Sequence, residues 1–203
     1  MTEKEKMLNE KMYECNDEEL VLLRQKCHRL CLEYNNTLET EEEKRINILK
    51  DMGVKMDKNV YLQGPIYFDY GCFTSFGENS YANFNLTVLD TGYVNIGKNV
   101  FIGPSVNIVT SMHPLRYQDR NLFRSEKGYI TDKEYGLPIT IEDNCWIGTN
   151  VTICGGVTIG SGSVIGANSI VTKSIPKNSL AVGNPCKVIR QITDKDVIDK
   201  KYL

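Results

Sequence analysis

The chain has 203 residues, of which 41% are hydrophobic, with a formal net charge of -2 and a pI near 5.8. This charge balance argues against a nucleic-acid-binding surface, and no apolar run approaches the roughly 20 residues of a membrane span. The opening residues, MTEKEKMLNEKM, are too charged for a signal peptide, so we expect a cytoplasmic protein with a small-molecule partner. The length suits one domain with an appendage.

The cysteines indicate a reducing compartment. Seven occur, an odd number, and none form a CxxC pair, so neither a disulfide framework nor a zinc ribbon is indicated. We expect reduced thiols.

Residues 1–53 are predicted to form helices. Asn16 followed by Glu19 resembles a capping box, and Thr40 with Glu43 repeats that start signal before an apolar stretch. Gly53 is the expected stop of the second helix. The apolar positions at helical spacing are Leu20, Leu23, Cys27, Leu30, Cys31 and Tyr34.

One cluster in this segment allows two interpretations. Cys27, His28 and Cys31 could ligate a metal ion. However, Cys27 and Cys31 lie on the apolar stripe, so ordinary packing is favoured.

From residue 54 to 192 the period of the sequence becomes six. Aliphatic side chains recur in steps of six from Ile96 to Ile108 and from Ile141 to Val171, with a second phase at Val94, Val100 and Val106. This period fits neither a helix nor a flat sheet, but it is typical of a parallel β-helix, in which each hexapeptide supplies one short strand and one turn. Small residues follow the inward aliphatic positions at Gly97, Gly103, Gly148, Gly160 and Gly166, where positive φ or tight clearance is expected to require glycine.

The rhythm stops at one place. Between Pro114 and Leu137 it is suspended, which predicts an external loop, and His113, one of two histidines, stands at the start of that loop. Residues 193–203 are expected to form a C-terminal tail.

Three motifs give the chain a family resemblance. YANFN at 81–85, HP at 113–114 and PITIEDNCWIG at 138–148, together with the closing run IVTKSIPKNSLAVGNPCKVIRQI, are similar to the maltose and galactoside O-acetyltransferases. The resemblance covers nearly the whole chain. It implies a left-handed parallel β-helix, a homotrimer with active sites between subunits, acetyl-CoA in the groove between two solenoids, and a sugar acceptor.

The resemblance also implies catalytic roles. His113 would be the general base, since a largely neutral imidazole can take the proton of a sugar hydroxyl near pH 7. Asn83 would orient that hydroxyl, and the backbone amide of Thr149 would stabilise the oxyanion. From the residues alone, His113 could instead bond a turn, and Asn83 could belong to an asparagine ladder.

Coenzyme A contacts are implied for the late coils. Lys173, Lys187 and Arg190 would meet its phosphates, although the family often has arginine where this chain has Lys187. The remaining positions implied to border the cofactor are Trp146, Gly148, Thr149, Ala167 and Thr172. Trp146 could equally be a packing anchor.

The acceptor side is implied to include four residues, namely Asp17, Asp69, Tyr81 and Asp90. Carboxylates are good acceptors for sugar hydroxyls. Asp69 stands where the galactoside enzymes have serine, which favours a maltose or glucose acceptor. Helix capping would explain Asp17 as well.

The same residues bear on other possible functions. A γ-type carbonic anhydrase needs three histidines for zinc, and the chain has His28 and His113 only, so we expect no metal. Cys145 and Cys154 are candidate nucleophiles, but Cys145 falls in a packed row, which favours direct transfer in a ternary complex. A galactoside, polysaccharide, antibiotic or serine acceptor, and a non-catalytic trimeric module, stay open as alternatives.

Overall fold

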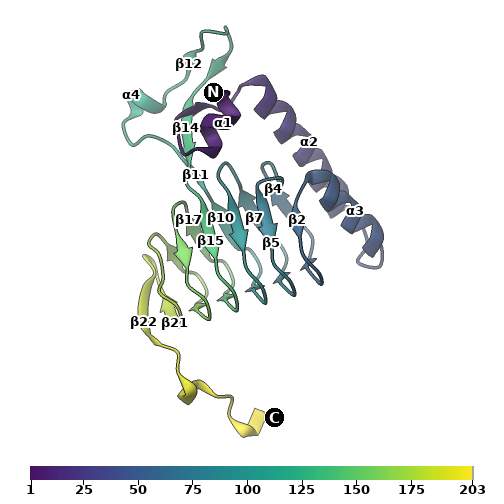
Figure 1. Cartoon of the computed structure of the whole chain (residues 1–203), viewed down its shortest axis with the longest axis vertical. Helices are drawn as coiled ribbons and strands as arrows, with labels where there is room; N and C mark the ends of the chain where they lie inside the picture. Colours follow the sequence, from purple (N-terminus) through teal and green to yellow (C-terminus); the bar gives the residue numbers. More distant parts are fainter. Residues whose placement is uncertain (203) are drawn as a thin grey trace.

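The computed structural model describes residues 1–202 and forms a parallel β-helix with three flat sides (Figure 1). Each coil contributes one short strand to each of three sheets, and the strands pair in parallel register from coil to coil. The predicted solenoid is therefore confirmed, and its first strand pair begins at Lys55, close to the predicted boundary.

Two of the three sheets have five strands each. The first sheet contains, in spatial order, β18 (Thr158–Ile159), β15 (Ile139–Ile141), β8 (Val94–Ile96), β5 (Thr74–Phe76) and β2 (Lys55–Met56). The second sheet, which we call the site sheet, contains β20 (Ile170–Val171), β17 (Thr152–Cys154), β10 (Asn107–Val109), β7 (Leu86–Leu89) and β4 (Ile66–Phe68).

The third sheet has seven strands. It contains β22 (Lys187–Gln191), β21 (Ser179–Val182), β19 (Val164–Ile165), β16 (Trp146–Ile147), β9 (Phe101–Ile102), β6 (Tyr81–Ala82) and β3 (Tyr61–Leu62). All of its pairs are parallel except β21 with β22. Its outward face carries a row of half-exposed or exposed apolar side chains, Tyr61, Tyr81, Phe101 and Trp146.

The predicted inward positions form the core of the solenoid. Ile102, Ile108, Ile141, Ile147 and Ile153 have at most 1% of their surface exposed. Each buried aliphatic side chain contributes about 1.5–3 kcal/mol relative to an exposed one, and each coil buries its apolar surface against its neighbours.

At the corners of the coils, the expectation of positive φ at glycine is wrong, whereas the expectation of tight clearance is confirmed. The corner glycines have no positive φ, but a Cβ on Gly148 would lie 2.7 Å from the nitrogen of Ala167, so close packing of the coils excludes a side chain. Positive φ occurs instead at asparagines, which tolerate the left-handed conformation. A column of them, Asn59, Asn79, Asn99 and Asn144, is joined by side-chain hydrogen bonds of 2.9–3.3 Å.

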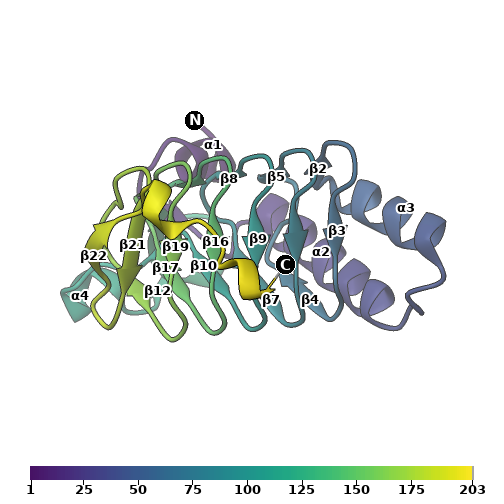
Figure 2. The same ribbon diagram turned by 90° about the horizontal axis from the view of Figure 1, so that it is seen from below.

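The two longer N-terminal helices pack at the start of the solenoid. α1 (Glu3–Leu8), α2 (Glu18–Asn35) and α3 (Glu42–Met52) precede the first coil, and α2 packs on α3 and on β4 (Figure 2). Gly53 ends α3 at φ 86°, as predicted. Both predicted starts were displaced by one residue, because Asp17 rather than Asn16 caps α2, and Glu41 rather than Thr40 precedes α3 without a side-chain cap.

The external excursion is more ordered than the predicted loop. β11 (Ser111–Met112) leaves the solenoid, and β14 (Lys133–Gly136) returns antiparallel beside it. Between them lie α4 (Tyr117–Arg120) and a hairpin of β12 (Phe123–Arg124) and β13 (Ile130–Thr131). β1 (Tyr13–Glu14) pairs with the other side of β14, so the N-terminal segment and the excursion share one small sheet.

The chain ends beyond the third sheet. β22 leads into two short 3-10 helices, η1 (Asp194–Asp196) and η2 (Lys200–Tyr202), and the last residue of the predicted 193–203 tail lies outside the described residues. Within residues 1–202, no helix is long and apolar enough to cross a membrane.

Candidate active site

His113 stands where β11 leaves the solenoid, with half of its side chain exposed. Its Nδ1 lies 3.4 Å from Oδ2 of Asp132, whose side chain is only 19% exposed. Asp132 precedes β14, and the antiparallel β11–β14 pair brings it back to His113. Asp132 was not among the residues predicted from the sequence, since it lies in the segment where the hexapeptide rhythm is absent.

Cys15 joins this pair from the N-terminal segment. Its thiol donates a 2.8 Å hydrogen bond to Oδ1 of Asp132, so the two carboxylate oxygens face two different partners. Burial, together with the hydrogen bond to Asp132, raises the pKa of the Cys15 thiol to about 12. Cys15 is therefore a neutral hydrogen-bond donor at physiological pH and a poor nucleophile.

A second carboxylate lies beside this group. Burial raises the pKa of Glu134 above its ordinary value, and the nearby His113 partly offsets this. Glu134 lies opposite Tyr13 in the β1–β14 pair, and Tyr13 is buried there. The surroundings of His113 are thus acidic and partly desolvated.

The strands of the site sheet run in parallel, so the sheet has one edge where its strands begin and another where they end. Asn83 lies at the edge where the strands begin, and His113 lies at the edge where they end. Asn83 follows β6 and precedes β7, whereas His113 follows β10, the next strand after β7 in that sheet. The four residues of β7 alone span about 13 Å at roughly 3.3 Å per residue. One chain therefore keeps the two predicted catalytic side chains apart. The Asn83 side chain accepts a hydrogen bond from the Phe84 amide and is not part of the asparagine column.

Thr149 and Ala167 lie at the same edge as Asn83. Gly148 pairs with the coil of Ala167, and Thr149 is exposed. The Thr149 amide donates no hydrogen bond within the described residues. A Cβ on Gly103 would lie 2.8 Å from that nitrogen, so glycine at 103 leaves the amide open.

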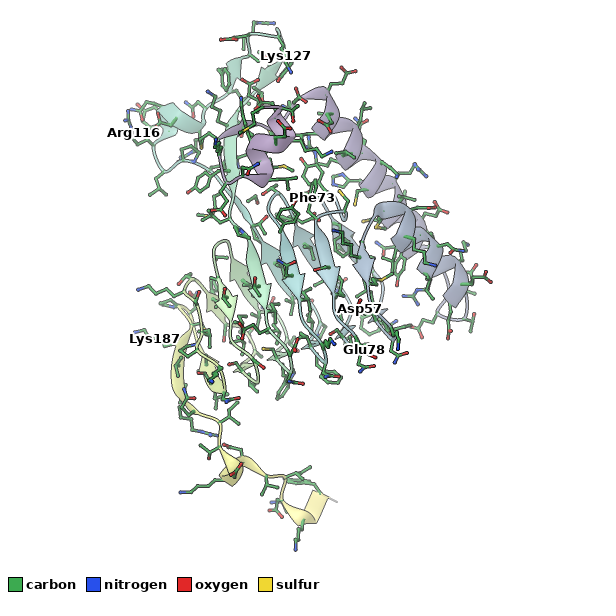
Figure 3. The ribbon with its side chains drawn as sticks, viewed as in Figure 1. Asp57, Phe73, Glu78, Arg116, Lys127 and Lys187 are labelled. Carbon is green, nitrogen blue, oxygen red and sulfur yellow. The ribbon has the colours of Figure 1, made fainter. Side chains whose placement is uncertain are left out.

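The remaining cofactor candidates are spread over the late coils. Thr172 and Lys173 are exposed just after β20, at the His113 edge of the site sheet. Lys187 lies on β22 (Figure 3) and, like Lys173, forms no ion pair within residues 1–202. Arg190 is already engaged, since its guanidinium makes two hydrogen bonds, of 2.6 and 2.8 Å, with Asp196. Trp146 is 57% exposed on the outward face of the third sheet.

Among the residues predicted to contact the acceptor, Asp69 borders a cavity and is partly exposed. It follows β4, its Oδ1 lies 3.5 Å from Nε2 of His28 on α2, and burial raises its pKa above the ordinary range. A cavity of about 380 Å³ adjoins this pair, walled by Leu32, Tyr67, Phe68 and Leu89. Half of the Tyr67 side chain is exposed.

Three other acceptor predictions do not gather around His113. Asp90 is fully buried, and its carboxyl accepts hydrogen bonds from Tyr70, Gly71 and Thr74 at 2.9–3.2 Å, so its oxygens have partners within the chain. Asp17 caps α2 and pairs with Lys127 at 2.7 Å, which matches the capping alternative. Tyr81 stacks on Tyr61 in the third sheet.

Three of the other cysteines are packed in the interior. Cys145 is fully buried and Cys27 and Cys31 are at most 5% exposed, as the packing interpretation predicted. All seven thiols are free. Within residues 1–202, no group of three or more His, Cys, Asp or Glu side chains is arranged to hold a metal ion.

Comparisons with known proteins find similarity to hexapeptide-repeat acetyltransferases. Residues 6–52 match the maltose acetyltransferase hexapeptide capping motif, and residues 138–173 match six repeats of the bacterial transferase hexapeptide. The galactoside O-acetyltransferase of Escherichia coli K12 is 41% identical over 82% of this chain and 78% of its own length.

Solved structures agree in fold over nearly the whole chain. A maltose O-acetyltransferase from Clostridium difficile 630 is 47% identical, with a TM-score of 0.87 over 96% of this chain and 99% of that one. A galactoside acetyltransferase in complex with coenzyme A is 39% identical, with a TM-score of 0.86 over 98% and 97% of the two chains. A hexapeptide-repeat acetyltransferase from Vibrio cholerae, complexed with acetyl coenzyme A, is 34% identical, with a TM-score of 0.81 over 96% and 100%.

Proposed function

We propose, because the chain belongs to the maltose and galactoside O-acetyltransferase family, that it transfers an acetyl group from acetyl-CoA to a hydroxyl of a maltose- or glucose-type sugar. The observation that carries this proposal is His113, half exposed at the root of the excursion with a carboxylate at Nδ1. That arrangement leaves Nε2 free to accept a proton from an acceptor hydroxyl.

The reaction follows from these groups. As Nε2 of His113 takes the proton, the acceptor oxygen attacks the thioester carbonyl and forms a tetrahedral intermediate with a negative oxygen. The unpaired Thr149 amide is a suitable donor to that oxygen. Collapse of the intermediate breaks the carbon–sulfur bond, and His113 returns the proton to the departing coenzyme A thiolate. Direct transfer is favoured over an acetyl-cysteine route, because the Cys15 thiol beside the site stays protonated.

A site between subunits is supported by where the candidates lie. His113, Asp69 and Lys173 lie at one edge of the site sheet, whereas Asn83 and Thr149 lie at the other. Both groups of residues can serve one reaction if the edge of one solenoid that carries His113 faces the edge of a second copy that carries Asn83. A closed trimer with heterologous contacts supplies three such junctions.

Coenzyme A is the proposed co-substrate, as in the solved relatives that hold it. The exposed, unpaired ammonium groups of Lys173 and Lys187 suit its phosphates, and the small residues Gly148 and Ala167 leave room for its extended arm at the corner of the coils. The proposed chemistry assigns no step to a metal ion.

The cavity beside Asp69 favours a larger acceptor. Leu89 on its wall pairs with Val109, four residues before His113. An acceptor with its reacting hydroxyl at His113 could therefore extend across β7 toward Asp69 and Tyr67. Because the cavity combines an aromatic face with a carboxylate, it suits a second sugar ring, which favours maltose over glucose.

The test is the release of coenzyme A from acetyl-CoA, measured for wild type and His113→Ala with maltose, glucose, a galactoside and serine. Because the protein carries thiols of its own, each assay is blanked against enzyme without acceptor. We expect turnover with the glucose-type sugars and a loss of about a hundredfold or more in His113→Ala. Equal rates in the two proteins would overturn the assignment of His113.

A non-catalytic trimeric module is the second candidate. It predicts no stabilisation by coenzyme A, whereas a ligand that binds only the folded state raises the unfolding temperature. An unchanged melting temperature at saturating coenzyme A, together with no turnover, would favour the module.

A further inference from the structure

We infer that Asp132 is a positioning residue for His113, holding its imidazole with the proton on Nδ1, and that the Cys15 thiol holds Asp132 in place. The kinetic part of this inference rests on the proposed acetyl transfer, but the position of the proton on the ring does not. Nothing in the hexapeptide pattern or in the family motifs of the sequence points to either Asp132 or Cys15.

The geometry divides the carboxylate between two partners. Oδ1 of Asp132 accepts the Cys15 thiol at 2.8 Å, and Oδ2 faces Nδ1 of His113 at 3.4 Å. The second distance is a close contact rather than a formed hydrogen bond, and such contacts often shorten when substrate binds. With Oδ1 occupied by Cys15, Oδ2 stays directed at the imidazole.

The fold fixes both partners of Asp132. His113 continues β11 and Asp132 precedes β14, and these two strands pair with Met112 opposite Tyr135. Cys15 continues β1, which pairs with the other side of β14. A side-chain hydrogen bond of 3.0 Å from Asn16 to the carbonyl of Ile130 ties the residue after Cys15 to the same segment. The three groups therefore come from the three strands of one small sheet.

The charges around His113 favour the same tautomer. Asp132 and Glu134 face it from the returning strand, and beyond them lie the Cys15 thiol and the Tyr13 hydroxyl on the N-terminal segment. Cys15 and Tyr13 both have pKa values raised by burial, so both are neutral at pH 7 and neither places a negative charge beside the imidazole. A carboxylate beside Nδ1 favours a proton there, which leaves the lone pair of Nε2 for the acceptor hydroxyl.

The direct test is the ring ¹⁵N NMR spectrum. The chain has only two histidines, so His28→Gln assigns the His113 signals by subtraction. In wild type above pH 8 we expect the Nδ1-protonated tautomer of His113 to dominate. In Asp132→Asn the side-chain amide can donate to Nδ1, so we expect the proton to move to Nε2. A wild-type spectrum dominated by the Nε2-protonated tautomer, or one unchanged in Asp132→Asn, would overturn the inference.

Kinetics give an independent readout. We expect kcat to fall about a hundredfold or more in Asp132→Asn, because the wrong tautomer cannot act as a base. Asp132→Glu should recover part of this loss, and the KM for acetyl-CoA should change by less than about twofold in both variants. Cys15→Ala should lower kcat about fivefold, as expected for one lost hydrogen bond, whereas Cys15→Ser keeps a donor and should stay near wild type.

A matched control separates positioning from general damage to the excursion. Asp119 lies in the same excursion, is exposed, and contacts only Arg116 among the charged side chains within residues 1–202. Asp119→Asn should leave both the tautomer and kcat unchanged. Equal losses in Asp119→Asn and Asp132→Asn, or equal losses in Cys15→Ser and Cys15→Ala, would overturn the inference. If wild type transfers acetyl to no sugar, the proposed function fails, and the tautomer measurement still decides the role of Asp132.

Discussion

Asn83 and His113 lie beyond opposite ends of the strands of one five-stranded sheet, separated by at least the length of β7. Two side chains proposed to act on one hydroxyl are therefore held apart within a chain by the regular geometry of the coil. In the proposed trimer, each subunit supplies one half of two different sites.

Subunit mixing tests this arrangement. His113→Ala and Asn83→Ala should each be nearly inactive, but randomly mixed trimers of the two should recover about a quarter of wild-type activity, since half of the subunits supply each intact edge. The measurement is coenzyme A release after co-refolding equal amounts of the two variants. If both side chains acted from the same chain, no mixture would recover activity.

The cavity beside Asp69 should discriminate acceptors by size. Tyr67→Ala removes the aromatic wall, and His28→Ala removes the partner of Asp69. We expect each change to raise the KM for maltose about tenfold, because contacts at one pocket are worth about 1–3 kcal/mol. The KM for glucose should stay within about twofold, since a single ring at His113 does not reach the cavity.

Equal increases in the two KM values would place the second sugar elsewhere. Leu22→Ala, an exposed position on α2, is the control for general effects of changing that helix.

The two cations of β22 should differ in their effect on coenzyme A. Lys187 is free to meet a phosphate, whereas Arg190 is held by Asp196. We expect Lys187→Ala to raise the KM for acetyl-CoA about fivefold with kcat unchanged, and the effect to shrink as salt increases. Arg190→Ala should have a smaller effect.

Releasing Arg190 is the complementary experiment. Asp196→Asn removes its counter-charge, and we expect the KM for acetyl-CoA to fall if the guanidinium then reaches the cofactor. An acetyl-CoA analogue without the 3′-phosphate identifies which phosphate Lys187 meets, since its KM should not respond to Lys187→Ala if that phosphate is the partner.

Asp90 should make the stability of the protein depend on pH. Burial raises the pKa of its carboxyl to about 7 in the folded protein, against an unfolded value of about 3.9. Between about pH 4 and pH 7 the folded state therefore binds more protons than the unfolded state, so the free energy of unfolding should fall as pH rises. Urea unfolding at several pH values in this window measures the slope.

Asp90→Asn is the variant that tests the cause. The amide oxygen can still accept the backbone N–H groups of Tyr70 and Gly71, and the fold should persist with a flatter dependence on pH. Asp90→Ala should instead cost about 2–3 kcal/mol, because buried donors lose their acceptor. Stability that rises with pH in wild type would show that the hydrogen bonds to the carboxylate outweigh its burial.

The sequence by itself determined the solenoid. Its period of six is a local property, since each hexapeptide contains its own inward aliphatic residue and its own corner residue. Every coil repeats this pattern. The end of α3 at Gly53 was also predictable from local sequence. Glycine readily adopts the left-handed backbone conformation, and that conformation ends a helix. His113 stands out in the sequence because it lies where the regular pattern stops.

Tertiary structure alone decided the partners of His113. Asp132 reaches it through an antiparallel return over a segment with no period, and Cys15 arrives from a strand about a hundred residues earlier in the chain. The burial of Asp90 and the pairing of Arg190 with Asp196 are likewise set by how the chain folds back on itself. Local spacing carries no information about contacts of this kind, because they depend on which distant segments pair.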